Sequence, residues 1–270
     1  MSGRLIICPT PIGNLEDVTL RVLAALRDAD IVACEDTRRT RVLLDRYGVK
    51  ARLVSYHEHN ERERARELVR RMRTGAVVAL VSDAGTPLVS DPGFVLVQAA
   101  VAAGLEVEVL PGPSAAVSAL VASALPAERW RFVGFLPRRR GELEEVFRSG
   151  ETVVAFESPR RVAASMAVLA SLDEARPVAV VRELTKVHEE VIRGSARELA
   201  ERFVSAPPRG EVAVVVGGAP AGSAVEAGPA VEAVRRLVEA GARPRAAAAV
   251  VADLTGVGAN ELYRALTALK

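Results

Sequence analysis

The stretch VVALVSDAGTPLVSDPG, residues 77–93, decides the fold. Its first five residues are apolar and rich in valine, which is typical of a strand buried on both faces of a sheet. The Gly, Pro, Asp and Ser residues that follow are those that form turns. Ligands of open α/β sheets bind just beyond the carboxyl ends of the strands. The loop that carries Asp83 and Thr86 is therefore the first candidate for a binding site.

The same pattern of strand, loop and helix recurs on both sides of this stretch. Short apolar runs are followed each time by small or polar residues, at 5–8, 31–35, 53–56 and 107–110. The loop after the first run contains Pro9 and Pro11, which exclude helix, and Gly13, which allows the backbone to approach a ligand closely. Ser114 can cap the helix after the last run. These units are expected to place several loops of small residues at one edge of a sheet.

A change of composition between 127 and 150 indicates a second α/β part, with strands expected at 152–156, 178–181 and 212–216. We place the N-terminal α/β domain at 1–112 and the C-terminal one at 113–220. Residues 217–228 are rich in Gly, Ala, Ser and Pro and are expected to form a linker. Residues 229–270 show three short helical patterns, which predict a small module for packing or dimerisation rather than a DNA reader.

The composition limits the classes of protein to which the chain can belong but does not identify its function. Half of the 270 residues are hydrophobic and 26% are charged, so a large core is expected and disorder is not. A net charge of +2 neither requires nor excludes a nucleic-acid partner. Cys8 and Cys34 end apolar runs, which favours buried thiols and a reducing compartment. Without a signal peptide or an apolar run of membrane-spanning length, the expected protein is soluble and cytoplasmic.

Several motifs are missing, and their absence narrows the classes of enzyme. The chain has no Gly-x-Gly-x-x-Gly after its first strand and no phosphate-binding lysine loop, which weakens dinucleotide and nucleoside-triphosphate binding. It has no Gly-x-Ser-x-Gly elbow of a serine hydrolase. His57 and His59 could ligate a metal, but a hydrogen-bonded loop is the better reading, and no metal is predicted.

Arginines stand beside aromatic residues in the second part. Arg138–Arg140 follow Trp130, Phe132 and Phe135. Contact with single-stranded RNA needs cations for the phosphates and rings on which bases can stack. The alternative is a solvated run of charge next to core aromatics.

The chain resembles the tetrapyrrole methylase superfamily over nearly its whole length. The stretches that carry the resemblance are Pro9–Leu15, Cys34–Arg38, Ser55–Glu61, Ser82–Gly93, Pro111–Ala116, Gly134–Pro137, Phe156–Arg161, Arg182–Lys186, His188–Glu190 and Arg209–Val212. It is most similar to the members that act on ribosomal RNA. The resemblance implies two fused α/β domains, S-adenosylmethionine in the cleft between them, and a homodimer. It also implies 2′-O-methylation of a cytidine in 16S rRNA, near the decoding centre.

The resemblance also suggests which residues contact the cofactor. Three loops of the first domain and segments of the second would line its pocket. The residues expected there are Thr10, Pro11, Gly13, Asp83, Thr86, Ser114, Ala115, Phe156, Leu184 and Val212.

A ribose hydroxyl is a weak nucleophile until it loses its proton, so a general base is expected. The candidates are Glu183, Lys186 with a lowered pKa, Glu35 and Asp36, and the sequence does not choose among them. Phosphate contacts are expected from arginines, whose neutralisation of phosphates makes affinity depend on salt. The candidates are Arg38, Arg39, Arg138, Arg139, Arg140, Arg160 and Arg161.

Two other classes stay open. One is a methyltransferase that acts on a tetrapyrrole small molecule, and the other is an RNA-binding protein without catalysis. The arginines beside aromatics and the helical C-terminal module favour the RNA methyltransferase over the small-molecule enzyme.

Overall fold

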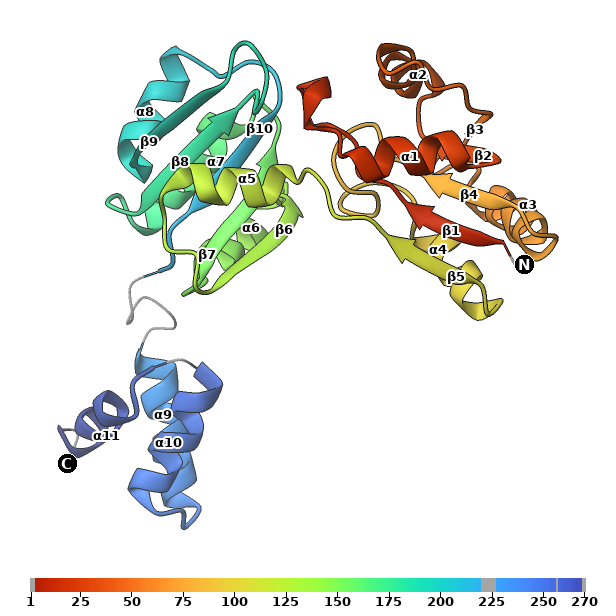
Figure 1. Cartoon of the computed structure of the whole chain (residues 1–270). Coiled ribbons are helices and arrows are strands. Elements are labelled where there is room, and N and C mark those ends of the chain that lie inside the picture. The colour runs from red at the N-terminus through yellow and green to blue at the C-terminus, as the bar shows by residue number, and fades with distance from the viewer. Residues whose placement is uncertain (1–2, 220–226, 256, 269–270) are drawn as a thin grey trace. The chain divides into compact units, whose positions relative to one another are not determined.

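The computed structural model describes residues 3–219, 227–255 and 257–268 (Figure 1). By its contacts the chain forms two compact units. The first runs to Ala122 and also takes the later segment Val181–Glu190. The second comprises Ser123–Val180 and the chain from Val191 onward. The expected domain boundary is near residue 112, and the contacts divide the chain after Ala122. The expected linker falls largely on residues 220–226, which lie outside the described part.

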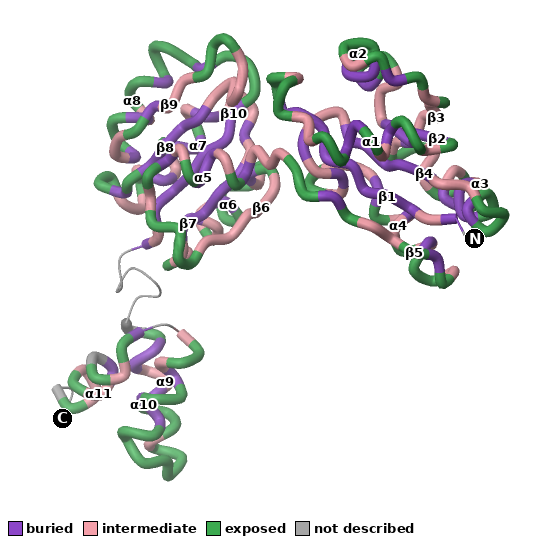
Figure 2. Tube along the Cα trace, in the orientation of Figure 1, coloured by how far each residue is buried: buried purple, intermediate pink, exposed green. Residues whose placement is uncertain are grey.

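The first unit is built on a five-stranded sheet in the order β3-β2-β4-β1-β5, in which every paired strand is parallel. Its strands are β1 (Arg4–Ile7), β2 (Ile31–Cys34), β3 (Leu53–Ser55), β4 (Val77–Leu80) and β5 (Glu106–Val109). Val78, Ala79 and Leu80 are buried, which confirms the expectation of a strand covered on both faces (Figure 2). Because all strands point the same way, the loops that follow them meet at one edge.

Helices cover both faces of this sheet because successive residues of a strand point to opposite sides. Leu5 and Ile7 pack with Leu68 of α3 (Glu61–Arg73) and Leu96 of α4 (Phe94–Ala102). Ile6 and Cys8 pack on the other face with residues of α1 (Leu20–Asp28) and α2 (Thr37–Arg46). The 3-10 helix η1 (Leu15–Asp17) precedes α1, and α5 (Ala115–Ser123) follows β5.

The second unit is built on a mixed sheet in the order β6-β7-β10-β8-β9. Its strands are β6 (Trp130–Phe135), β7 (Thr152–Glu157), β8 (Pro177–Arg182), β9 (Glu190–Ser195) and β10 (Val212–Val216). β6 runs parallel to β7, whereas β10 runs antiparallel to it. The core is formed with α6 (Arg140–Phe147), α7 (Val162–Leu172) and α8 (Ala196–Ser205).

The aromatic residues expected to stack on RNA lie on β6. The rings of Phe132 and Phe135 meet the ring of Phe156 edge-on, with centroids 5.0 and 5.7 Å apart. Such pairs stabilise a fold by packing. These two phenylalanines therefore already have a ring partner within the second unit.

The C-terminal residues form the three expected helices, α9 (Ala227–Glu239), α10 (Pro244–Thr255) and α11 (Ala259–Ala268). They share a small core of their own in which Val234, Ala248 and Leu262 are almost fully buried. The guanidinium of Arg245 lies over the ring of Tyr263, 5.4 Å from its centroid. This module thus has a core and does not consist of independent helices.

No helix in the described ranges combines the length and the apolar character needed to cross a membrane.

Candidate functional site

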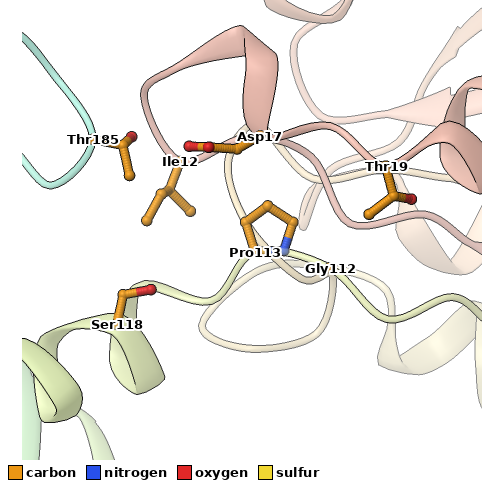
Figure 3. Close-up of a pocket in the computed structure, with 7 residues that line it drawn as sticks. All are labelled: Ile12, Asp17, Thr19, Gly112, Pro113, Ser118 and Thr185. Atoms are coloured by element: carbon orange, nitrogen blue, oxygen red, sulfur yellow. The ribbon is translucent and has the colours of Figure 1, made fainter.

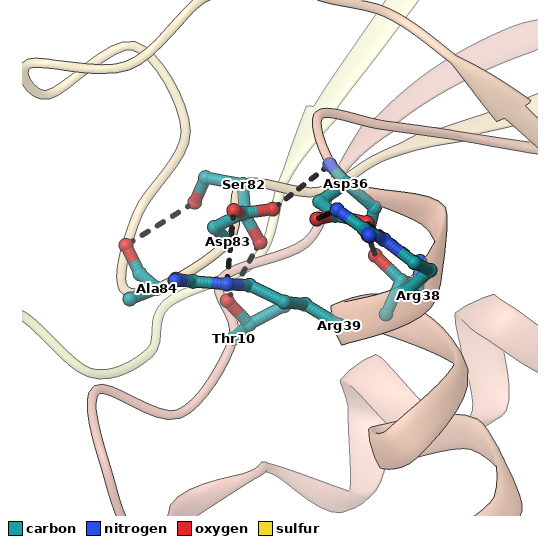
Figure 4. Close-up of polar contacts among 8 residues, drawn as sticks. Thr10, Asp36, Arg38, Arg39, Ser82, Asp83 and Ala84 are labelled. Carbon is teal, nitrogen blue, oxygen red and sulfur yellow. Dashed lines mark hydrogen bonds and ion pairs between the residues drawn. The ribbon is translucent and has the colours of Figure 1, made fainter.

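The loops after β1 and β4 are joined into one polar edge (Figure 4). The backbone N–H of Thr10 donates to Gly85 O at 2.8 Å, and the N–H of Gly85 donates back to Thr10 O at 3.0 Å. The Thr10 hydroxyl donates to Ser82 O at 3.0 Å, and the Ser82 hydroxyl donates to Gly85 O at 3.1 Å. Gly85 has a φ of +79°, a conformation that glycine adopts without strain. The sequence signals of Thr10 and of the Asp83 loop therefore converge on one place.

The loop after β5 is attached to the same edge by Thr86. The Thr86 hydroxyl donates to Pro113 O at 3.1 Å. Beyond Pro113, the hydroxyl of Ser114 accepts from Val117 N at 3.4 Å at the start of α5, as expected for a cap. The loops after β1, β4 and β5 are thus connected directly by hydrogen bonds.

Asp83 connects this edge to the loop after β2. Its Oδ1 accepts from the Asp36 N–H at 3.0 Å, and its Oδ2 lies 3.6 Å from Arg39 Nε. The Arg38 guanidinium donates hydrogen bonds to the carboxylate of Asp36, with Nη2 2.8 Å from Oδ2. These hydrogen bonds lower the pKa of Asp36 to about 2. Asp36 is therefore a structural anion, whereas the Asp83 side chain remains 20% exposed at the edge.

A second group of acids surrounds Asp83. Burial raises the pKa of Glu35, and the charges of Asp83 and Glu58 add to the rise. Burial raises the pKa of Asp91 to about 7, helped by Glu35 and Asp83 and opposed by a hydrogen bond from Ser82. The sequence analysis missed Asp91 as a functional candidate. Its signal was the turn Ser-Asp-Pro-Gly at the end of the central stretch.

The segment Val181–Glu190 carries three predicted site residues into the first unit. Glu183 and Thr185 have φ values of 51° and 65°, which non-glycine residues seldom adopt. The Asn14 N–H donates to Thr185 Oγ1 at 2.9 Å, and a Cβ on Gly13 would lie 2.6 Å from Lys186 Cγ. Only glycine fits at position 13. Backbone strain held by such contacts is typical of functional sites.

The predicted catalytic pair in this segment is an ion pair. Lys186 Nζ lies 2.9 Å from Glu183 Oε1. Leu184 stands between them on the same turn, and its carbonyl oxygen is 2.9 Å from the position of a Gly13 Cβ. The structure thus brings Glu183, Leu184 and Lys186 to the loop that contains Gly13.

A groove of about 340 Å³ opens beside these loops (Figure 3). It is lined by Ile12, Asp17, Thr19, Gly112, Pro113, Ser118 and Thr185. Ile12 belongs to the first loop, which was expected to line the cofactor pocket, and the other six residues were not among those predicted for the site. Asp17 and Thr19 follow the first loop by only a few residues, and the Leu-Glu-Asp-Val-Thr stretch was the available signal.

In the second unit, Phe156 and Val212 lie on the paired strands β7 and β10, where Ala213 is the register partner of Phe156. Next to Phe156, the buried Glu157 accepts from Ser165 Oγ at 2.6 Å and lies 3.2 Å from Arg161 Nη1. Arg161 also donates to Pro137 O at 2.7 Å. Arg161 is therefore held by this unit on several sides.

Most of the remaining predicted RNA contacts are arginines at the surface. Arg139 and Arg140 pair with Glu142 and Glu144 at 3.3 and 2.7 Å on α6. Arg138 and Arg160 are exposed. Exposed pairs of this kind contribute little to stability, so these cations are available to exchange a carboxylate for a phosphate.

The His57 and His59 rings meet edge-on, with centroids 5.8 Å apart. Among the residues that the structure describes, no group of three or more His, Cys, Asp or Glu side chains is placed to hold a metal ion.

The family model of tetrapyrrole (corrin/porphyrin) methylases matches residues 4–200. Proteins named ribosomal RNA small subunit methyltransferase I are similar along most of the chain. The one from Mesorhizobium japonicum is 47% identical over 98% of this chain and 92% of its own length. The one from Thermotoga maritima is 43% identical over 80% of this chain and 99% of its own length.

Solved structures show the same fold. Uroporphyrin-III-C-methyltransferase from Thermus thermophilus superposes with a TM-score of 0.60 at 24% identity, over 80% of this chain and 94% of that one. A structure of the uroporphyrin-III C-methyltransferase complexed with S-adenosylhomocysteine gives 0.57 at 22% identity, over 80% and 97%. At such identities the likeness concerns the fold alone, and it confirms the predicted architecture of two α/β parts.

Proposed function

We infer the function from one premise: this chain belongs to the tetrapyrrole methylase family, and within it to the ribosomal RNA small subunit methyltransferases I. It is thus a methyltransferase that uses S-adenosylmethionine and acts on ribosomal RNA. We propose that the acceptor is the ribose 2′-oxygen of a cytidine in 16S rRNA, near the decoding centre. The observation that carries this proposal is the 47% identity along 98% of the chain.

The polar edge of the first unit fits the cofactor by its chemistry. A methionine ammonium and ribose hydroxyls need a carboxylate acceptor, and Asp83 presents one whose nearest cation is 3.6 Å away. A methionine carboxylate needs N–H donors, and the start of α5 after Ser114 offers them. We assign Thr10, Pro11, Gly13, Asp83, Thr86, Ser114 and Ala115 to the cofactor. Phe156, Leu184 and Val212 are assigned to its adenine.

When bound, S-adenosylmethionine supplies a methyl carbon that the ribose oxygen attacks while the carbon–sulfur bond breaks. The residues of this chain must align the hydroxyl and take its proton. Glu35 is a candidate for the second task, because burial and the neighbouring carboxylates of Asp83 and Glu58 raise its pKa and make it a stronger base than an exposed glutamate. Glu183 is the other carboxylate candidate, and the Lys186 ammonium 2.9 Å away holds its Oε1 in place.

RNA binding is assigned to Arg38, Arg39, Arg138, Arg139, Arg140, Arg160 and Arg161. Each phosphate that they neutralise releases counterions, so affinity should fall as salt rises. We further propose that the protein acts in the cytoplasm as a homodimer, on 16S rRNA or on the assembled small subunit.

A tetrapyrrole substrate is less well supported. The structures named for porphyrinoid substrates are at most 24% identical, whereas the relatives named for ribosomal RNA are 40–47% identical. No feature of the described residues favours the small molecule specifically.

The test uses small ribosomal subunits from a strain that lacks this activity. The protein is incubated with them and labelled S-adenosylmethionine, and the modified nucleotide is located by mass spectrometry. We expect one labelled cytidine with the methyl group on its ribose. Label on a base, or label only on an added porphyrinoid, would overturn the proposal.

A further inference from the structure

We propose that the groove lined by Ile12, Asp17, Pro113, Ser118 and Thr185 receives the target base, and that Asp17 selects cytosine over uracil. This inference rests on the proposed function, because it names the part of the RNA substrate that the first unit reads. It adds a specificity-determining residue to the site.

Asp17 is the acid at this groove that lacks a cation. It lies on η1 next to Glu16, whose carboxylate is 3.7 Å from Arg46 Nη2. Within the described ranges, the carboxylate of Asp17 makes neither a hydrogen bond nor an ion pair. Figure 3 shows it directed toward Ile12 and Thr185, which line the same groove. An acceptor is thus presented to any ligand that enters.

Two hydroxyl groups supply donors at the same groove. Thr185 Oγ1 accepts from Asn14 N at 2.9 Å, so its own proton can be donated elsewhere. The hydroxyl of Ser118, on α5, has no hydrogen-bond partner among the residues that the structure describes. Ile12 and Pro113 add apolar surface that a base can face. Apolar walls with a few convergent polar groups, in about 340 Å³, are typical of a small-ligand site.

This set of groups matches the edge of cytosine. Cytosine presents an amino donor at N4, and acceptors at N3 and O2. A carboxylate accepts from the amino group, while hydroxyls donate to the two acceptors. Uracil presents O4 to the carboxylate, which leaves two acceptors facing each other, and its N3 is a donor. The groove therefore discriminates between the two pyrimidines by hydrogen bonding.

The groove adjoins the residues assigned to the cofactor but shares none with them. Ile12 stands between Pro11 and Gly13, and Pro113 immediately precedes Ser114. Methyl transfer requires two reactants held side by side. A separate groove next to the cofactor residues meets this requirement.

The experiment compares Asp17→Asn and Asp17→Ala with the unaltered protein. Asp17 is exposed on a short helix, so both variants are expected to fold. Methyl transfer is measured on small subunits that carry either cytidine or uridine at the target position. Binding of two short RNAs that differ only in that base is measured by fluorescence anisotropy. A good base contact gives roughly a tenfold preference or more.

We expect the unaltered protein to prefer cytidine by at least about tenfold in both assays. Asp17→Asn should bring the ratio of cytidine to uridine close to one, because an amide can donate to uracil O4. Asp17→Ala should lower this ratio by weakening the binding of cytidine. The matched control is Glu16→Gln, on the same helix and paired with Arg46, which should retain the preference.

Two results would overturn the inference: an unchanged preference in both Asp17 variants, or weaker binding of S-adenosylmethionine in calorimetry with the base preference intact. The second result would assign the groove to the cofactor. Absence of any methyl transfer by the unaltered protein would instead refute the proposed function, and the binding assay would still report on base preference.

Discussion

The two units use acids and arginines in different ways. In the first, the carboxylate of Asp83 follows the parallel strand β4 and stays partly exposed. In the second, Glu157 is fully buried among Ser165 and Arg161, and Arg176, only 3% exposed, donates to the carbonyls of Phe147 and Gly217. In a parallel sheet the loops after the strands meet at one edge, where ligands can reach them. In the second unit the buried charges instead hold parts of the unit together, as an internal framework.

The strongest test of this difference is Glu157→Ala. It would leave the Arg161 and Ser165 groups without their buried acceptor, and we expect a loss of about 3 kcal/mol of stability. The chain has a single tryptophan, Trp130 on β6, so urea unfolding followed by its fluorescence reports on the second unit.

Glu157→Gln should lose less than Glu157→Ala because it keeps an acceptor for Ser165. Glu145→Ala, at an exposed position of α6, is the control and should unfold like the unaltered protein. If Glu157→Ala unfolds at the same urea concentration as Glu145→Ala, Glu157 is not part of the framework.

The next largest effect is expected at Asp83. Asp83→Ala removes the acceptor of the Asp36 N–H and the charge that we assign to the cofactor. Affinity for S-adenosylmethionine, measured by calorimetry, should fall at least about tenfold, because a hydrogen bond to a charged group contributes roughly 1.5–3 kcal/mol. Trp130 unfolding should change little, since Asp83 lies in the first unit.

Asp83→Asn keeps an oxygen that can accept from the Asp36 N–H but removes the negative charge. This variant therefore distinguishes the effect of the charge from the effect of the loop contact. Glu63→Gln, on the exposed face of α3, is the control. An affinity in Asp83→Ala equal to that of Glu63→Gln would remove Asp83 from the cofactor site.

The smallest effect concerns Asp91, whose pKa is raised from 3.8 to about 7. Between these values the folded protein binds a proton that the unfolded chain releases, so stability falls as pH rises through this window. Asp91→Asn should therefore be more stable than the unaltered protein at pH 8 and equal to it near pH 4. Because the group is only half-buried, we expect about 1 kcal/mol rather than the full electrostatic cost.

Thermal unfolding at pH 4, 6 and 8 checks this expectation. An advantage of Asp91→Asn that is the same at all three values would show that the change acts through packing, not through titration.

Local patterns predicted the parts of the fold that depend on neighbours in sequence. The apolar run before Asp83 had to be a buried strand, and Gly, Pro and Ser after it had to be a turn. Long-range contacts were out of reach. Nothing near Thr185 indicates that it accepts a hydrogen bond from Asn14, 171 positions away. Likewise, the sequence around Trp130, Phe132 and Phe135 suggested RNA stacking. It does not show that β6 pairs with β7, and this pairing is what brings two of these rings onto Phe156.

The return of Val181–Glu190 to the first unit has a consequence for biosynthesis. The hydrogen bond from Asn14 to Thr185 joins the beginning of the chain to a segment made much later. At about 5–20 residues per second, the ribosome needs roughly ten seconds or more to make the chain between them. The N-terminal sheet can form during that wait, but the edge where its loops meet is completed only after most of the polypeptide has emerged.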